Sequence, residues 1–104
     1  MSFRPSSAPK PGRPKGVKSL DPAIAKVFGT ALQERRLAAG MSQEFLALTS
    51  GIERSYLSRL ERGVSQPTLL AMLKLAKGLG CETFELLQQA EKAFMRRRVT
   101  ARTR

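Results

Sequence analysis

The chain has 104 residues, enough for one small core, and 41% of them are apolar, which is close to the globular average. Its apolar runs are too short for a membrane span, and no apolar segment follows the basic start as a secretory signal requires. The single cysteine, Cys81, excludes an internal disulfide, and the lack of histidine removes the usual zinc ligand and the commonest general base. We therefore expect a cytoplasmic protein that needs no metal or cofactor and is not an enzyme.

The net charge of +11 is concentrated at the two ends of the chain. Residues 1–19 and 96–104 each carry five basic residues and no acid, whereas residues 20–95 carry nine basic and eight acidic residues. Such tails favour a polyanionic partner, and nucleic acid is favoured over an acidic membrane because no basic amphipathic helix with bulky aromatics is visible. The alternative is that the tails only increase solubility.

The ordered domain is expected over residues 20–95, after a proline-rich, disordered arm at 1–19. Asp21 is a strong N-cap and Pro22 suits the first helical position, so a first helix should begin there. It should run to about Ala39, where Gly40 stops it. Its apolar side is predicted to consist of Ile24, Val27, Phe28, Ala31, Leu32 and Leu37.

Two short helices are predicted next. Ser42 caps one that ends at Gly51, and the other spans 54–62, with Glu53 at a cap position that this residue fills poorly. Residues expected to face the core are Phe45, Leu46 and Ala47, with Leu48 left open, followed by Ile52, Leu57 and Leu60.

Two further helices are predicted, one from about Thr68 to Leu79 and one from about Thr83 to Arg97, with a basic tail at 96–104. Their expected apolar stripes are Leu69, Met72, Leu73, Ala76 and Leu79 in the first and Phe84, Leu87, Ala90 and Phe94 in the second. No strand-like alternation is found. The prediction is an all-α, compact five-helix domain with disordered basic tails.

The stretch from residue 42 to 63 carries the clearest functional pattern. A small Ala47 lets two helices cross closely, and Gly51 permits the positive φ that a short turn between them needs. Burial of Leu57 and Leu60 then leaves one face outward. Arginine on such a face can form two hydrogen bonds with guanine, and serine can form hydrogen bonds with several bases. The alternative is that this face is only solvated. The outward residues are Arg54, Ser55, Ser58 and Arg59.

This pattern resembles the Cro and phage-repressor type helix-turn-helix family, also called the XRE family, over about Phe28 to Leu87. The resemblance implies an operator-binding domain, usually dimeric, with a recognition helix near 54–62 in the major groove of double-stranded DNA. It implies base contacts by Arg54, Ser55 and Arg59, and a structural ion pair between Arg36 and Glu61. It also implies phosphate contacts by Gln43, Arg62, Ser65 and Gln66. Glu53 departs from the small polar residue usual at its position.

These features predict a sequence-specific transcriptional regulator that forms a homodimer through the last helix, with Phe84 inward and Leu87 and Phe94 at the seam. One alternative is an antitoxin-type interaction module that also regulates its own operon. A toxin or RNA polymerase is then a candidate partner. Another alternative is an architectural or RNA-binding protein that uses only its tails.

The arm contains a second motif, Lys10-Pro11-Gly12-Arg13-Pro14-Lys15-Gly16, which looks like an AT-hook. In such a motif the central Gly-Arg-Pro lies extended in a narrow A·T minor groove while flanking cations reach phosphates. Arg13 and Lys15 are therefore candidate DNA contacts. Nonspecific phosphate contact, or no contact, is the alternative.

Replacement of Arg13 by alanine should weaken binding selectively where A·T-rich DNA flanks or divides the half-sites, because a narrow groove concentrates negative potential around an inserted arginine. Titration of wild type and Arg13→Ala against A·T-rich and G·C-rich flanks at one salt concentration measures this. Equal losses of affinity on both flanks would show that the arm contacts DNA without regard to sequence.

Overall fold

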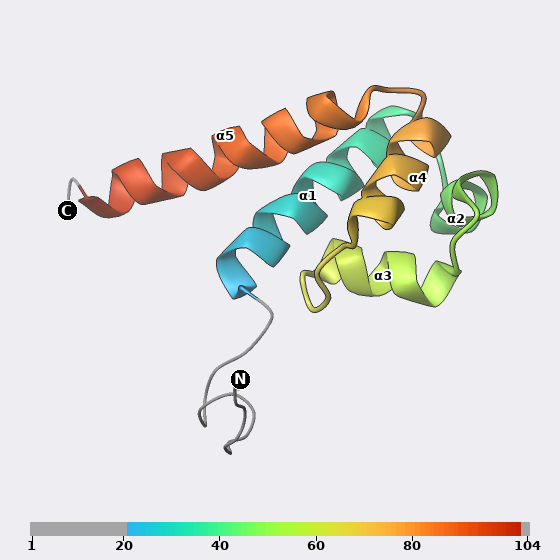
Figure 1. Ribbon diagram of the computed structural model, residues 1–104, viewed down its shortest axis with the longest axis horizontal. Helices are drawn as coiled ribbons and strands as arrows, with labels where there is room; N and C mark the ends of the chain where they lie inside the picture. The colour runs from blue at the N-terminus through green and yellow to red at the C-terminus, as the bar shows by residue number, and fades with distance from the viewer. Residues whose placement is uncertain (1–20, 103–104) are drawn as a thin grey trace, which may run out of the picture.

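The computed structural model describes the backbone of residues 21–102 and the side chains of residues 21–96. Arg13 and Lys15, in the N-terminal arm, lie outside the described residues. Within residues 21–102 the chain forms five helices and no strand, as the sequence predicts (Figure 1). The helices are α1 (Pro22–Ala38), α2 (Gln43–Ser50), α3 (Arg54–Arg62), α4 (Leu69–Leu79) and α5 (Thr83–Arg102). None of them is both long and apolar enough to cross a bilayer.

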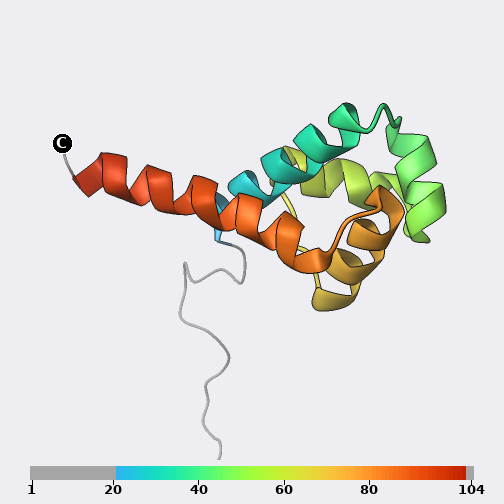
Figure 2. The ribbon, with the colours of Figure 1, turned by 90° about the horizontal axis from the view of Figure 1, so that it is seen from above.

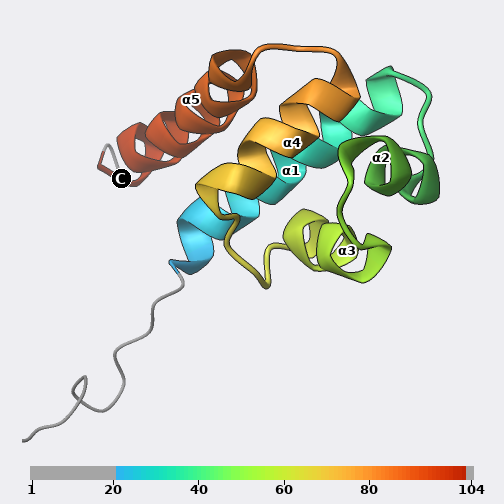
Figure 3. The same cartoon turned by 45° about the vertical axis from the view of Figure 1, so that its right-hand side comes forward.

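Helix α1 is the central element. It packs against α3 on one side and α5 on the other, while α2 packs against α3 and α4. Seen from above, α5 runs alongside α1 and its last turns project past the body (Figure 2). A view turned by 45° shows α3 at the edge of the body away from α5 (Figure 3). The fold therefore leaves one side of α3 on the surface.

Local sequence signals set the helix ends. The Asp21 carboxylate accepts hydrogen bonds from the N–H groups of Ala23 and Ile24, and Ser42 Oγ accepts one from the Phe45 N–H. Gly51 and Gly63 end α2 and α3 in the left-handed conformation, with φ of 73° and 76°. Such φ values favour glycine because it has no Cβ. The predicted starts and stops of the second and third helices are confirmed.

The largest fully buried side chains of the core are six leucines: Leu32, Leu46, Leu57, Leu60, Leu75 and Leu86. Two of them, Leu75 and Leu86, are absent from the predicted apolar stripes. Leu48, which the sequence left open, is exposed. Several residues that were predicted to face the core are exposed as well: Ile24, Leu37, Phe45, Leu69, Leu73 and Phe84. These inward assignments are wrong.

The error on α4 has a steric cause. Helix α4 turns Ala71, Leu75 and Gly78 inward, and a Cβ added to Gly78 would lie 2.1 Å from Ser50 Oγ of α2. The small residues of that face let the two helices approach closely, whereas the Leu69–Leu73 side would hold them apart. On α5, Leu86 takes the inward position and Phe84 turns outward.

Helix α5 continues five residues beyond its expected end at Arg97, through Arg102. The segment holds no glycine or proline to end it, and arginine is a good helix former. The first part of the basic segment 96–104 therefore extends the helix.

A buried ion pair connects α1 to α3. Arg36 donates to both carboxylate oxygens of Glu61, from Nε at 2.6 Å and from Nη2 at 2.9 Å. The Arg36 and Glu61 side chains are only 9% and 1% exposed. The hydrogen bond to Glu61 raises the pKa of Arg36 above its ordinary value in spite of the burial. The predicted structural pair is confirmed.

Two neighbours complete this network. Gln43 Nε2 donates to Glu61 Oε1 at 2.9 Å, and Arg36 Nη1 donates to the Met41 carbonyl at 2.8 Å. A buried ion pair is favourable only when its remaining polar atoms are also bonded. The network therefore ties the start of α2 and the end of α1 to α3.

Glycine 29 makes this connection possible. A Cβ added to Gly29 would lie 2.2 Å from the Leu60 carbonyl oxygen, so the backbones of α1 and α3 are in direct contact there. Ala31 and Leu32 of α1, close by in the chain, are buried in the same core as Leu60.

Replacement of Glu61 by alanine should lower the free energy of unfolding by about 3–5 kcal/mol, because it leaves the Arg36 guanidinium buried without its partner. Gln43→Ala removes one donor from the same charged carboxylate and should cost less, about 1.5–3 kcal/mol. Urea unfolding followed by circular dichroism measures both. Equal, small losses would show that the pair does not hold the helices together.

Candidate nucleic-acid interface

One face of α3 is anchored and the other is exposed. Leu57, Leu60 and Glu61 are buried. The outward side consists of Arg54, Ser55, Arg59 and Arg62, which are exposed, and Ser58, which is half-buried. The predicted outward residues therefore share one surface of a helix whose back is fixed in the core.

The turn before α3 forms as the sequence predicts. Ala47 is buried where α2 meets the core, Gly51 supplies the left-handed residue, and Ile52 is half-buried against the core. Among the described residues, Glu53 forms no side-chain hydrogen bond to the start of α3. Glu53 is therefore a weak cap, in agreement with its residue type.

Arg59 is held by two neighbours. Its Nε donates to Ser65 Oγ at 3.3 Å, and its guanidinium carbon lies 5.6 Å from the centre of the Tyr56 ring. The Tyr56 hydroxyl in turn accepts a hydrogen bond from the Thr68 N–H at 3.4 Å. Tyr56 thus links α3 to the cap of α4 and provides a cation–π surface for Arg59.

Arg54 also has a partner. Its Nε lies 3.1 Å from Oε2 of Glu44, in the first turn of α2. Glu44 was not among the predicted site residues. Glu44 lies beside Arg54 because α2 and α3 cross there. The two residues are too far apart in the sequence for a helical spacing to predict the contact.

The expected phosphate contacts divide into three groups. Gln43 donates a hydrogen bond to Glu61, and Ser65 accepts one from Arg59. Gln66 is turned toward α1, where its Oε1 accepts the Asp21 N–H at 2.8 Å. Arg62 lines a shallow depression beside the start of α1 together with Lys26, a cation that the sequence analysis did not single out.

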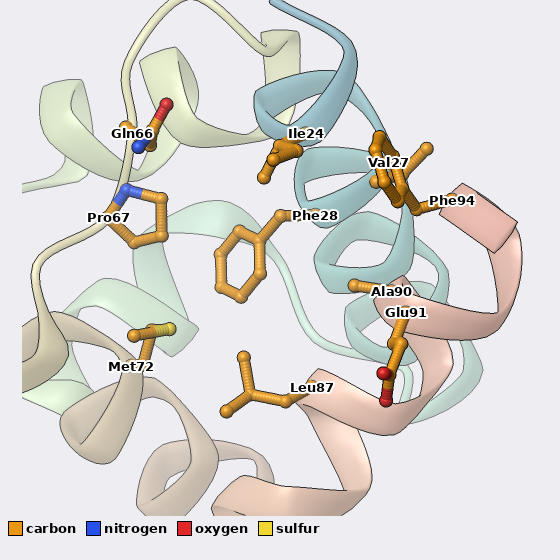
Figure 4. A pocket seen from close by; sticks show the side chains of 10 residues that line it. All are labelled: Ile24, Val27, Phe28, Gln66, Pro67, Met72, Leu87, Ala90, Glu91 and Phe94. Carbon is orange, nitrogen blue, oxygen red and sulfur yellow. The ribbon is translucent and has the colours of Figure 1, made fainter. Parts of the chain in front are cut away.

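A second surface feature is an apolar groove of about 390 Å³ between α1, α5 and the segment that leads into α4 (Figure 4). Leu87 and Phe94 of α5 line it, together with Ile24 and Val27 of α1 and Pro67. Phe84, expected inward, is instead 66% exposed, and Phe94 is half-buried in the groove.

Comparison with known proteins agrees with this geometry. The family model described as helix-turn-helix matches residues 32–86, slightly more than half of the chain. The restriction–modification controller protein C.AhdI from Aeromonas hydrophila is 47% identical, over 62% of this chain and 97% of its own, with a TM-score of 0.60.

Two further proteins are similar. The uncharacterized HTH-type transcriptional regulator y4dJ of Sinorhizobium fredii is 36% identical over 64 residues, 62% of this chain and 83% of its own. The controller protein C.Esp1396I, solved as a tetramer in complex with its natural 35 base-pair operator, is 26% identical. That match covers 69% of this chain and 95% of the other, with a TM-score of 0.64. The chain thus belongs to the XRE-type helix-turn-helix family of DNA-binding transcriptional regulators.

Proposed function

We propose that this regulator binds a palindromic operator as a homodimer and reads its bases with α3 in the major groove. The observation that carries the proposal is the outward face of α3, where arginines and serines lie over a back that is fixed in the core. Major-groove base edges suit this set, because arginine pairs with guanine through two hydrogen bonds and serine serves several bases. The cytoplasm, where a regulator of this kind meets DNA, is the proposed location.

In this proposal Arg54, Ser55, Ser58 and Arg59 contact bases. Phosphates on either side of the contacted bases are bound by Gln43, Arg62 and Ser65. Gln66 would donate to a phosphate from its side-chain amide nitrogen. Phosphate contacts supply most of the affinity, whereas base contacts supply the discrimination between sequences. The C.Esp1396I complex with operator DNA supports the proposal.

Arg54→Ala and Arg59→Ala should each weaken binding to the operator by about 1–3 kcal/mol and relax the preference at one base pair. Arg62→Ala, the matched control, should weaken binding to all sequences equally and lower the salt slope by about one unit. Titrations against single-base operator variants measure these effects. The base-reading assignment fails if the three variants behave alike.

The groove between α1 and α5 is the proposed dimer contact. One recognition helix reads only a few base pairs, so two copies related by a two-fold axis are expected, with recognition helices about 34–36 Å apart. Helix α5 carries Leu87 and Phe94 along an apolar groove at the surface of a single copy. The solved tetramer of C.Esp1396I on its operator is in keeping with self-association.

Leu87→Glu should convert the dimer to a monomer and lower the affinity for the full palindrome about 100-fold, because the second half-site loses its tethered copy. Leu87 is preferred to Phe94 for this test because it is more exposed, so its replacement leaves the fold intact. Leu37→Glu, an exposed leucine of α1 outside the groove, is the matched control. Sedimentation equilibrium, free and on DNA, measures the change.

A dimer that survives Leu87→Glu would place the seam elsewhere on the molecule. A wild-type protein that is monomeric both free and on DNA would contradict dimerisation itself. It would favour the antitoxin-type alternative, in which another protein covers the groove.

A further inference from the structure

We propose that Glu44 is a positioning residue that orients the Arg54 guanidinium toward guanine and so sharpens sequence discrimination. The proposal rests on the base-reading function of Arg54. It concerns a residue that lies on α2, outside the recognition helix, and whose carboxylate would not by itself be chosen as a DNA contact.

The contact geometry is the first argument. Glu44 Oε2 lies 3.1 Å from the Nε of Arg54. The carboxylate forms an ion pair on the Nε side of the guanidinium, and among the described residues the two terminal nitrogens of Arg54 have no hydrogen-bond partner. Those two nitrogens are a fork that matches the O6 and N7 acceptors of guanine. The pair therefore favours orientations of Arg54 in which Nε faces Glu44 and the terminal nitrogens stay available.

Stability is a poor explanation for this pair. The Arg54 and Glu44 side chains are 56% and 69% exposed, and ion pairs with such exposure contribute little to folding. The situation changes when DNA covers α3, because exclusion of water strengthens the attraction between the two charges. The pair should thus matter chiefly in the complex.

Glu44 stands on a fixed support. The preceding residue, Gln43, donates to the buried Glu61 carboxylate, and Ser42 caps the helix directly before it. Its place in the first turn of α2 is favourable for a negative charge. The backbone of Glu44 is thus held in place, so its side chain reaches Arg54 from a fixed position on α2.

A carboxylate beside DNA also has a cost. It repels the phosphates, so it must weaken binding to every sequence, correct or not. When the base opposite Arg54 is not guanine, the Arg54–Glu44 pair is covered by DNA without the guanine acceptors, which weakens binding to that DNA sequence further. Glu44 is therefore expected to lower overall affinity and raise discrimination.

Glu53 provides the matched control. It is exposed, directly precedes Arg54, and carries the same charge near the same surface. Among the described residues Arg54 pairs with Glu44, and Glu53 forms no ion pair. Loss of Glu53 should relieve phosphate repulsion without releasing the Arg54 side chain.

The experiment uses the full chain and a DNA duplex selected by the wild type from random sequence. Affinities are measured for that duplex, for every single-base variant of it and for unrelated DNA, with wild type, Glu44→Ala, Glu44→Gln, Glu53→Ala, Arg54→Ala and the Glu44→Ala/Arg54→Ala double variant. Melting temperatures confirm that each variant is folded.

Glu44→Ala should bind unrelated DNA more tightly than wild type. At the base pair whose preference Arg54→Ala relaxes, Glu44→Ala should reduce the discrimination roughly three- to tenfold. That is part of the discrimination that one arginine with two hydrogen bonds to guanine provides. Glu44→Gln keeps an acceptor at the same place and should retain part of the discrimination. Glu53→Ala should tighten binding to unrelated DNA but keep the discrimination at that base pair. In the Arg54→Ala background, loss of Glu44 should cause no further loss of discrimination there.

Different failures can be told apart. One outcome is that Arg54→Ala relaxes the preference at one base pair while Glu44→Ala leaves that preference intact. In that case the positioning role of Glu44 is overturned and the base-reading function of Arg54 stands. Equal behaviour of Glu44→Ala and Glu53→Ala would reduce Glu44 to a general negative charge and overturn the proposal too. If Arg54→Ala alters no preference, the base-reading assignment and the proposal built on it both fall.

Discussion

The hydrogen bonds of the buried Glu61 carboxylate are the interaction on which the position of α3 depends. This carboxylate accepts hydrogen bonds from Arg36 of α1 and Gln43 of α2 while it belongs to α3, so a single side chain fixes three helices relative to one another. A helix of nine residues is not stable alone in water. The direction in which α3 presents its outward residues is therefore a property of this network and of the leucine core beside it.

Close backbone contact supplements the network. Gly29 brings α1 against the backbone of α3, and Gly78 brings α4 against Ser50 of α2. Both glycines lie inside helices, where glycine usually costs about 1 kcal/mol relative to alanine. At Gly29 a larger residue would meet the α3 backbone and push α1 and α3 apart, whereas at Gly78 it would meet the Ser50 and Leu46 side chains of α2. The position of α3 thus rests in part on Gly29, a residue that does not meet DNA in the proposed complex.

The surface residues form small groups rather than independent contacts. Arg59 is held by Tyr56 and Ser65, and Arg54 by Glu44, so each proposed base-reading arginine has an orienting neighbour. Restraint of a long side chain before binding reduces the conformational entropy that binding would otherwise cost. On the other side of α1, the groove beside α5 offers an apolar surface for a second copy. In the proposed complex, base reading and dimerisation use separate faces of one small domain.

What the sequence determined by itself was local: where helices begin and end, through Asp21, Ser42, Gly51 and Gly63, and that the chain carries a helix-turn-helix. Its resemblance to a known family also anticipated the Arg36–Glu61 pair. Capping and turns depend on neighbours in the chain, so they can be seen in a linear sequence. Only the tertiary structure decided which side of α4 and α5 faces the core, because both helices carry apolar residues on more than one side. It also decided that Glu44 meets Arg54, since that contact exists only through the angle at which α2 and α3 cross.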